Sequence, residues 1–198
     1  MNLQRFLEQR QLKVASKCII QELVKKKIIQ YSYRINTNSA YSVLGLHGRY
    51  EKGIEKLVLN TAQRLDRCNF FLFRTPIHIP SDWISEDAVP ELQQFLQHRA
   101  PIISLHGTRR QDIFLGGAKT TSILNLRDHL RIPIWNKHVE VLLGSSNQDV
   151  VPELAGVSED NLVNYHPGGI QIELPLSIRT NVLERMKFYA AMSLWYYT

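Results

Sequence analysis

Short apolar segments of strand length alternate along this chain with longer stretches whose apolar residues recur at helical spacing. The alternation predicts strands over residues 28–35, 41–46, 69–73, 102–105, 112–115, 139–143 and 169–174. It predicts helices over residues 2–28, 51–67, 84–98, 120–130 and 181–197. Strands that alternate with helices favour an α/β fold, in which helices cover both faces of a largely buried sheet.

The chain length sets the expected number of domains. Its 198 residues suit one domain, and the sequence contains no repeat or linker that would divide it. We predict a single domain over residues 1–198, with an N-terminal helical segment at 1–28 and a C-terminal helix at 180–198 that Thr180 caps. In this last helix we expect the following apolar side chains to face the core: Val182, Leu183, Met186, Tyr189, Ala190 and Trp195.

The chain is basic, with 24 Lys and Arg residues against 18 Asp and Glu residues and a net charge of +6. This surplus permits an acidic substrate, nucleic acid or no charged partner at all. Part of it lies in Lys25, Lys26 and Lys27, which suit the negative end of a helix dipole. The net charge alone therefore does not decide the function.

No segment of the sequence predicts a membrane or secretory location. No apolar run reaches the roughly 18 residues that cross a bilayer, and the first residues lack the pattern of a secretory signal. Cys18 and Cys68 are too few for a disulfide framework or a Cys-based zinc site. We expect a reducing, cytoplasmic location and no membrane partner.

Two predicted strands run directly into a His-Gly pair, at His47-Gly48 and at His106-Gly107. Ligands of α/β sheets gather where strands end, and Gly permits a sharp turn there. Glu51 follows His47 closely, and two imidazoles with one carboxylate are a sufficient ligand set for catalytic zinc. From the residues alone, an alternative stays open: both histidines could bond to backbone, with Glu51 as an N-terminal helix charge.

Glu173 lies in an alternating apolar stretch, where it faces the side of the strand opposite to Ile172 and Leu174. A buried carboxylate needs a reason, and burial raises its pKa toward the range of a general base or acid. The alternative is an edge strand that leaves Glu173 in water. Glu173 is therefore a candidate catalytic residue.

These segments together resemble the poly-γ-glutamate hydrolase family, zinc amidases associated with phages and bacilli. The resemblance covers roughly residues 30–180 and rests on Leu46-His47-Gly48, Glu51-Lys52-Gly53, Ser104-Leu105-His106-Gly107, Leu115-Gly116-Gly117 and the segment from Gly169 to Leu174 with Arg179 after it. The loop between the first His and the Glu is one residue shorter here than in the family pattern. The residue after Gly53 is also Ile54, where the family has Thr.

The resemblance implies a fold like that of zinc carboxypeptidases and related amidohydrolases: one α/β domain in three layers, with a central mixed sheet between helices. It implies zinc held by His47, Glu51 and His106. It also implies that Glu173 is the base that activates the attacking water and then protonates the leaving amine. We expect Arg179 to bind a substrate carboxylate, because a guanidinium can bind one bidentately.

Two further sets of residues are candidates for substrate binding. Arg109 and Arg110 follow the second His-Gly pair and could add positive charge at the mouth of the site, or form a solvated loop pair. His78 matches a His of the family near a strand end and could line the pocket, or be a surface residue between two prolines.

The sequence therefore predicts a zinc-dependent amidohydrolase that cleaves γ-glutamyl or similar amide bonds in an acidic, peptide-like substrate. One alternative is a non-catalytic nucleic-acid-binding or phage-associated module on the same fold. Another is a zinc deacylase that acts on aminoacylated RNA. A nucleic-acid partner would require a continuous basic surface, and the arginines, including Arg127 and Arg131, are spread over loop and helix. Nucleic acid is thus a possible but not a favoured partner.

Overall fold

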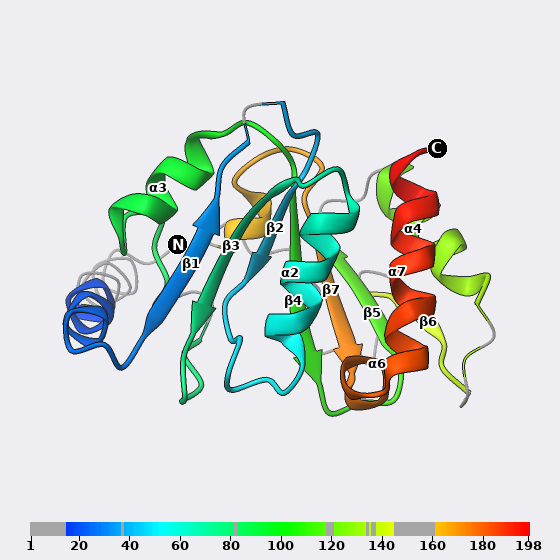
Figure 1. The fold of residues 1–198 in the computed structure, drawn as a ribbon, viewed down its shortest axis with the longest axis horizontal. Coiled ribbons are helices and arrows are strands. Elements are labelled where there is room, and N and C mark those ends of the chain that lie inside the picture. The colour runs from blue at the N-terminus through cyan, green and yellow to red at the C-terminus, as the bar shows by residue number, and fades with distance from the viewer. Residues whose placement is uncertain are drawn as a thin grey trace, which may run out of the picture.

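The computed structural model describes residues 15–36, 38–80, 83–117, 121–133, 135, 138–144 and 161–198 of the chain. Within these residues, a 7-stranded sheet has the order β1-β3-β2-β4-β7-β5-β6 (Figure 1). The strands are β1 Gln30–Arg34, β2 Ser42–Gly45, β3 Asn69–Arg74, β4 Ile102–Thr108, β5 Ile113–Gly117, β6 Val141–Leu143 and β7 Ile170–Pro175. Every strand predicted from the apolar segments is found, with its limits shifted by a few residues.

The sheet is mixed. Strands β3, β2, β4 and β7 are parallel neighbours, whereas β1 pairs antiparallel with β3 and β5 pairs antiparallel with β7. The edge strand β6 runs parallel to β5. The carboxyl ends of β3, β2, β4 and β7 therefore meet at one edge of the sheet, the lower edge in Figure 1.

Helices cover both faces of this sheet. The helices of the described residues are α2 Ile54–Arg64, α3 Pro90–Gln97, α4 Thr121–Arg131, the 3₁₀ turn η2 Leu162–Asn164, α6 Leu176–Thr180 and α7 Val182–Tyr196, together with helical residues 15–25. Helices α2, α4 and α7 pack on one face, in front of the sheet in Figure 1, and enclose one apolar core. Helix α3 and residues 15–25 enclose a second core on the other face. The predicted α/β fold with a central mixed sheet between helices is confirmed.

The path of the chain creates a switch point at the centre of the sheet. From β2 the chain passes through α2 to β3 on one side, and from β3 it passes through α3 to β4 on the other side of β2. Successive crossovers that leave in opposite directions open a crevice at the carboxyl ends of the two strands, where ligands of such folds bind. The segment after β2 and the end of β4, which carry the candidate histidines, both lie at this crevice.

Two boundaries differ from the sequence prediction near the candidate site. Strand β4 continues to Thr108, because its pairing with β7 extends to Thr108 and Pro175, so His106 lies inside the strand and not after it. Helix α2 begins at Ile54, with Gly53 as its N-cap, so Glu51 lies in the preceding turn. The predicted helical ranges 2–28 and 120–130 lie partly outside the described residues, at 2–14 and at Thr120.

The C-terminal helix also differs. Asn181, and not Thr180, caps α7, because its side chain accepts hydrogen bonds from the amides of Leu183 and Glu184. The expected core stripe is wrong for several members: Val182, Leu183, Met186 and Ala190 are exposed, whereas Phe188, Ala191, Met192, Tyr189 and Trp195 are buried. Helix α7 is apolar on most sides, so its periodicity does not select the buried face. Among the described residues, no helix is long and apolar enough to cross a membrane.

Candidate active site

His47 follows β2 and is buried, with 2% of its surface exposed. Its Nε2 lies 2.7 Å from the carbonyl oxygen of Ile79, and its Nδ1 lies 3.1 Å from Oε1 of Glu51. A carbonyl only accepts hydrogen bonds, so the partner assigns the proton to Nε2. The Nδ1 of neutral His47 therefore presents a lone pair toward Glu51.

Glu51 connects the segment after β2 with the end of β4. Its backbone amide bonds to the carbonyl of His47 at 2.8 Å, which closes one turn. Its Oε2 accepts a hydrogen bond of 2.7 Å from the amide of Gly107. Burial opposes ionisation of this carboxyl, but the hydrogen bond to His47, the neighbouring imidazoles and the amide of Gly107 outweigh it and lower the pKa of Glu51. The loop that is one residue shorter than the family pattern thus still brings Glu51 against His47.

His106 lies on β4 with only 5% of its surface exposed. Its Nε2 lies 2.8 Å from Oγ of Ser104, which precedes it by two residues and so faces the same side of the strand. Burial lowers the pKa of His106 to about 4, so the imidazole is neutral at physiological pH. Neutral imidazole is the form that binds metal ions.

His47, Glu51 and His106 offer ligand atoms that lie within 4.8 Å of one another, which makes them a group that could hold a metal ion. With His47 neutral, its Nδ1 and the facing Glu51 oxygen are both acceptors, and two acceptors at this distance require a positive charge between them. A proton can supply it: burial opposes protonation, but the hydrogen bond and charge of Glu51 outweigh burial and raise the pKa of His47. A metal cation can take that place, and two nitrogens with one carboxylate oxygen fit zinc.

Glu173 lies on β7 directly beside His106 of β4 in the sheet register, with Phe114 of β5 on its other side. It is 5% exposed, while Ile172 and Leu174 point into the core on the opposite face. The edge-strand alternative is wrong, because β7 lies between β4 and β5. Burial and then the charge of Glu51 raise the pKa of Glu173 to about 8.

Gln171, which the sequence reasoning missed, orients Glu173 and is itself held by Asn161. The side-chain amide of Asn161 donates to Oε1 of Gln171 at 2.7 Å, and the amide of Gln171 donates to Oε1 of Glu173 at 2.9 Å. Gln171 is buried and lies two residues before Glu173 on the same face, as Ser104 does relative to His106. The signal that could have identified Gln171 is a polar residue two positions before a candidate site residue in an otherwise apolar strand, and Ser104 shows the same pattern.

Comparison with known proteins identifies the family of this chain. A family model described as poly-gamma-glutamate hydrolase matches residues 19–193. The chain belongs to the poly-γ-glutamate hydrolase family. No curated protein matches it.

Two solved structures share the fold of this family member. A bacteriophage poly-gamma-glutamate hydrolase has 17% sequence identity and a TM-score of 0.67, over 85% of this chain and 87% of the other. A zinc-free apo structure of YndL has 23% identity and a TM-score of 0.65, over 85% of this chain and 89% of the other. Family membership places the chain among hydrolases of γ-glutamyl amide bonds.

Among the residues predicted to bind substrate, His78 lies beside His47 of the candidate metal-ligand group in this poly-γ-glutamate hydrolase homologue. It is exposed, and its ring centroid lies 5.1 Å from that of His47 and 5.3 Å from that of Tyr50. His78 and Tyr50, which is 46% exposed, therefore form part of the rim above the buried His47.

Arg109 and Arg110 are exposed on the segment after β4. They line a cavity of about 310 Å³ together with Gln111, Val139, Pro175, Leu176, Ser177 and Thr180. The guanidinium of Arg110 lies 5.5 Å from the ring centroid of Phe114, the strand neighbour of Glu173. These arginines are thus next to the candidate site but do not contact the three metal-ligand candidates by any described hydrogen bond.

Arg179 contacts backbone within the protein. The residue is 6% exposed, and its guanidinium donates to backbone carbonyls of Lys52, Thr108 and Leu174. A contact with a substrate carboxylate stays a prediction for this residue, and the observed contacts are structural.

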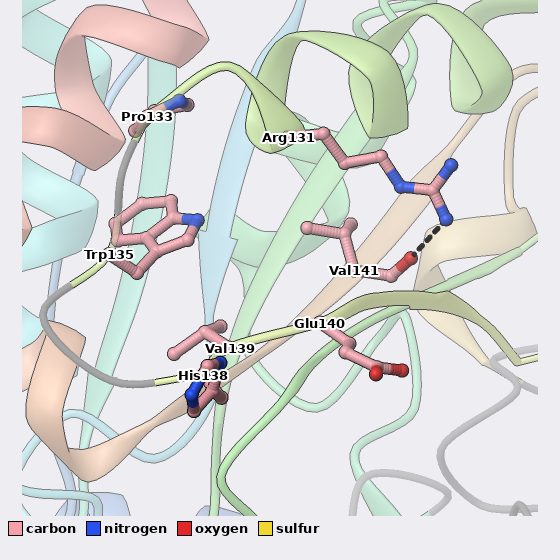
Figure 2. Close-up of a pocket in the computed structure, with 7 residues that line it drawn as sticks. All are labelled: Arg131, Pro133, Trp135, His138, Val139, Glu140 and Val141. Atoms are coloured by element: carbon pink, nitrogen blue, oxygen red, sulfur yellow. Dashed lines mark hydrogen bonds between the residues drawn. The ribbon is translucent and has the colours of Figure 1, made fainter.

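A second cavity, of about 350 Å³, lies at the β6 edge of the sheet (Figure 2). It is lined by Arg131, Pro133, Trp135, His138, Val139, Glu140 and Val141. The side chain of Arg131 donates to the carbonyl of Val141 at 3.2 Å, across the cavity wall. In the strand order β7 and β5 separate β6 from β4, and none of the candidate site residues lines this cavity. This cavity is therefore separate from the candidate site.

Proposed function

We propose that this protein is a zinc-dependent amidohydrolase that cleaves γ-glutamyl or similar amide bonds in an acidic, peptide-like substrate. The observation that carries the proposal is the position of Glu173 beside His106, which itself lies in a metal-ligand group with His47 and Glu51. Membership of the poly-γ-glutamate hydrolase family supports the reaction class.

His47, Glu51 and His106 would hold the zinc ion. The carbonyl of Ile79 and the hydroxyl of Ser104 each bond to one ring nitrogen of a histidine and so orient both imidazoles. Zinc bound there would supply Lewis-acid polarisation of the scissile carbonyl and would acidify water.

Glu173 is proposed to move the proton. Gln171 holds Oε1 of its carboxyl, so Oε2 is the oxygen that would take a proton from the attacking water and deliver it to the leaving amine. In the ion-free protein the pKa of about 8, caused first by burial, keeps Glu173 largely protonated at neutral pH. A positive charge beside the carboxyl favours its ionised form, which a general base requires.

The surroundings of the site suit an acidic substrate. Arg109 and Arg110 offer two exposed guanidinium groups beside the carboxyl ends of β4 and β7. Each could bind a substrate carboxylate bidentately. His78 and Tyr50 would contact the substrate at the rim.

A nucleic-acid partner gains no support from the described arginines. Arg127 pairs with Asp128 on α4, and Arg131 donates to the backbone of Val141 near the β6 edge. Each of these two arginines thus has a partner within the protein, and neither contact points to a nucleic acid.

Metal analysis together with hydrolysis of poly-γ-glutamate tests the proposal. Protein purified without chelator should contain close to one zinc per chain, and His106→Ala should lose it because one of three ligands is removed. Glu173→Gln should keep the zinc and lose turnover by at least about 100-fold, because the proton carrier is gone. Wild-type protein that binds no zinc would overturn the proposal, and full activity in Glu173→Gln would overturn the role of Glu173.

A further inference from the structure

Arg179 connects the chain segments that carry the candidate site. Its Nη1 donates to the carbonyl of Lys52 at 2.8 Å, its Nη2 to that of Thr108 at 3.2 Å, and its Nε to that of Leu174 at 3.0 Å. The acceptors follow site residues in each segment: Lys52 comes directly after Glu51, Thr108 two residues after His106, and Leu174 directly after Glu173. One side chain thus contacts the backbone next to two candidate metal ligands and the candidate proton carrier.

Two glycines near the site make room for Arg179. A Cβ at Gly107 would lie 2.6 Å from the guanidinium carbon of Arg179. A Cβ at Gly53 would overlap the backbone oxygen of Arg179, and Gly53 also has a positive φ of 92° that disfavours other residues. Both glycines therefore permit close packing of Arg179 against the segments that carry His106 and Glu51.

Arg179 is itself held in place. It belongs to α6, directly after β7, and its carbonyl accepts a hydrogen bond of 2.9 Å from Nη1 of Arg185. Its guanidinium is a planar group with several N–H donors, which lets it bond to three carbonyls in different directions. A lysine ammonium is a single point on a flexible chain and cannot reproduce that arrangement.

We propose that Arg179 is a positioning residue, which fixes the relative places of the Glu51, His106 and Glu173 segments through their backbone carbonyls. The expected effect of Arg179 on catalysis rests on the proposed function. Its effect on the relative positions of the three segments does not. It differs from substrate binding, because the guanidinium is buried and donates to the protein backbone.

The test compares wild-type protein with Arg179→Lys by three measurements. Amide hydrogen exchange should become faster in residues 47–53 and 106–110, because these segments lose their hydrogen bonds with the Arg179 guanidinium. Zinc affinity should fall about 10–100-fold, as for the loss of other residues that orient metal ligands. On poly-γ-glutamate, kcat should fall about 100-fold, since small misplacement of reacting groups has that effect, while KM should change by less than about 3-fold.

Arg34→Lys is the matched control, because Arg34 also donates to two backbone carbonyls, those of Ala62 and Cys68, but on the far side of the sheet at β1. It should leave zinc affinity and kcat unchanged. Gly107→Ala is a second variant that displaces the guanidinium while Arg179 remains, and it should reproduce the exchange and kcat changes of Arg179→Lys. This second variant keeps the test decisive if Arg179→Lys does not fold.

The possible results separate the two proposals. A rise in KM, with unchanged exchange and zinc affinity, would assign Arg179 to a substrate carboxylate and overturn the positioning role. Unchanged exchange in both variants would overturn it as well. If wild-type protein neither binds zinc nor cleaves the polymer, the proposed function fails, whereas faster exchange at 47–53 and 106–110 would still support the positioning role.

Discussion

At the scale of single residues, the site is built from polar side chains placed at every second position of two apolar strands. Ser104 and His106 lie two residues apart on β4, and Gln171 and Glu173 lie two residues apart on β7. In the parallel register Ser104 is beside Gln171 and His106 is beside Glu173, on one face of the sheet. Their polar groups bond to one another or to nearby backbone, which offsets the cost of their burial. The sequence could predict Glu173 because a buried carboxylate in an apolar strand needs a reason, and His106 because it precedes Gly after an apolar run.

Reasoning from single residues could not predict the hydrogen-bond partners of Arg179 within the protein. The sequence predicts a substrate carboxylate as a partner of Arg179, and within the protein its partners are carbonyls that lie more than 70 residues away or at the end of β7. Every residue has a backbone carbonyl, so the residue types of a sequence do not show which carbonyls a side chain contacts. Only the folded arrangement of α6, β4 and the turn before α2 identifies them.

Gln171→Met tests the orientation of Glu173. Gln171 donates to Glu173 and accepts from Asn161, and methionine has a similar volume but neither bond. The Gln171 hydrogen bond opposes the rise in the pKa of Glu173 that burial and Glu51 cause. Its loss should therefore move the acidic limb of the pH profile of kcat/KM to higher pH, and kcat should fall about 10-fold. The exposed Gln93→Met is the control, and an unmoved acidic limb in Gln171→Met would contradict this role.

At the scale of secondary-structure elements, apolar runs bounded by turn residues identify the strands well, but they locate the ends of elements less well. Strand β4 runs past the predicted end at Leu105, since pairing with β7 continues through Thr108. The start of α7 was missed by one residue, because Thr180 and Asn181 are both N-cap residues by type. Which of two adjacent candidates caps a helix depends on the backbone of the preceding α6, and that backbone is set by tertiary contacts.

Asn181→Ala should destabilise the protein by about 1 kcal/mol, because it removes the side-chain acceptor for the amides of Leu183 and Glu184 at the start of α7. Thr180→Ala is the matched neighbour. The Thr180 hydroxyl donates to the carbonyl of Leu176 and does not cap α7, so its loss should cost less than about 0.5 kcal/mol. Urea unfolding of both variants measures the difference, and equal destabilisation would mean that Asn181 is not the effective cap.

At the scale of the whole molecule, the strand order is the property that the sequence predicts least. Alternating strands and helices predict an α/β sheet, and the family resemblance implies that it is mixed, but neither states that β7 lies between β4 and β5. That insertion is what places Glu173 beside His106. The strand order depends on contacts between residues far apart in the chain, and local sequence patterns do not encode those contacts.

The free energy of unfolding of the whole molecule should depend on the ionisation of Glu173. In the metal-free protein burial and Glu51 raise its pKa from 4.5 to about 8. Between these pH values the folded chain keeps a proton that the unfolded chain releases, so wild-type stability falls as pH rises. Glu173→Gln removes this effect, and its advantage should grow from near zero below pH 4.5 to on the order of 3 kcal/mol at pH 7.

Urea unfolding with chelator present, at several pH values between 4 and 8, measures this advantage. Glu22→Gln, on the exposed surface of the helical residues 15–25, is the control and should show no such trend. A pH-independent difference between Glu173→Gln and wild type would mean that Glu173 ionises normally in the fold.

The position of β7 also has a consequence for how the chain reaches its native state. Strands β4 and β5 run in opposite directions and are joined only by residues 109–112, so early in folding they can pair directly as a hairpin. The native sheet requires that they remain apart until β7, more than 50 residues later in the chain, enters between them. A premature hairpin is a kinetic trap that must open first, so refolding should be slow relative to a sheet of sequential strands. Glu173 cannot lie beside His106 until β7 has entered the sheet, so the proposed catalytic pair requires this step.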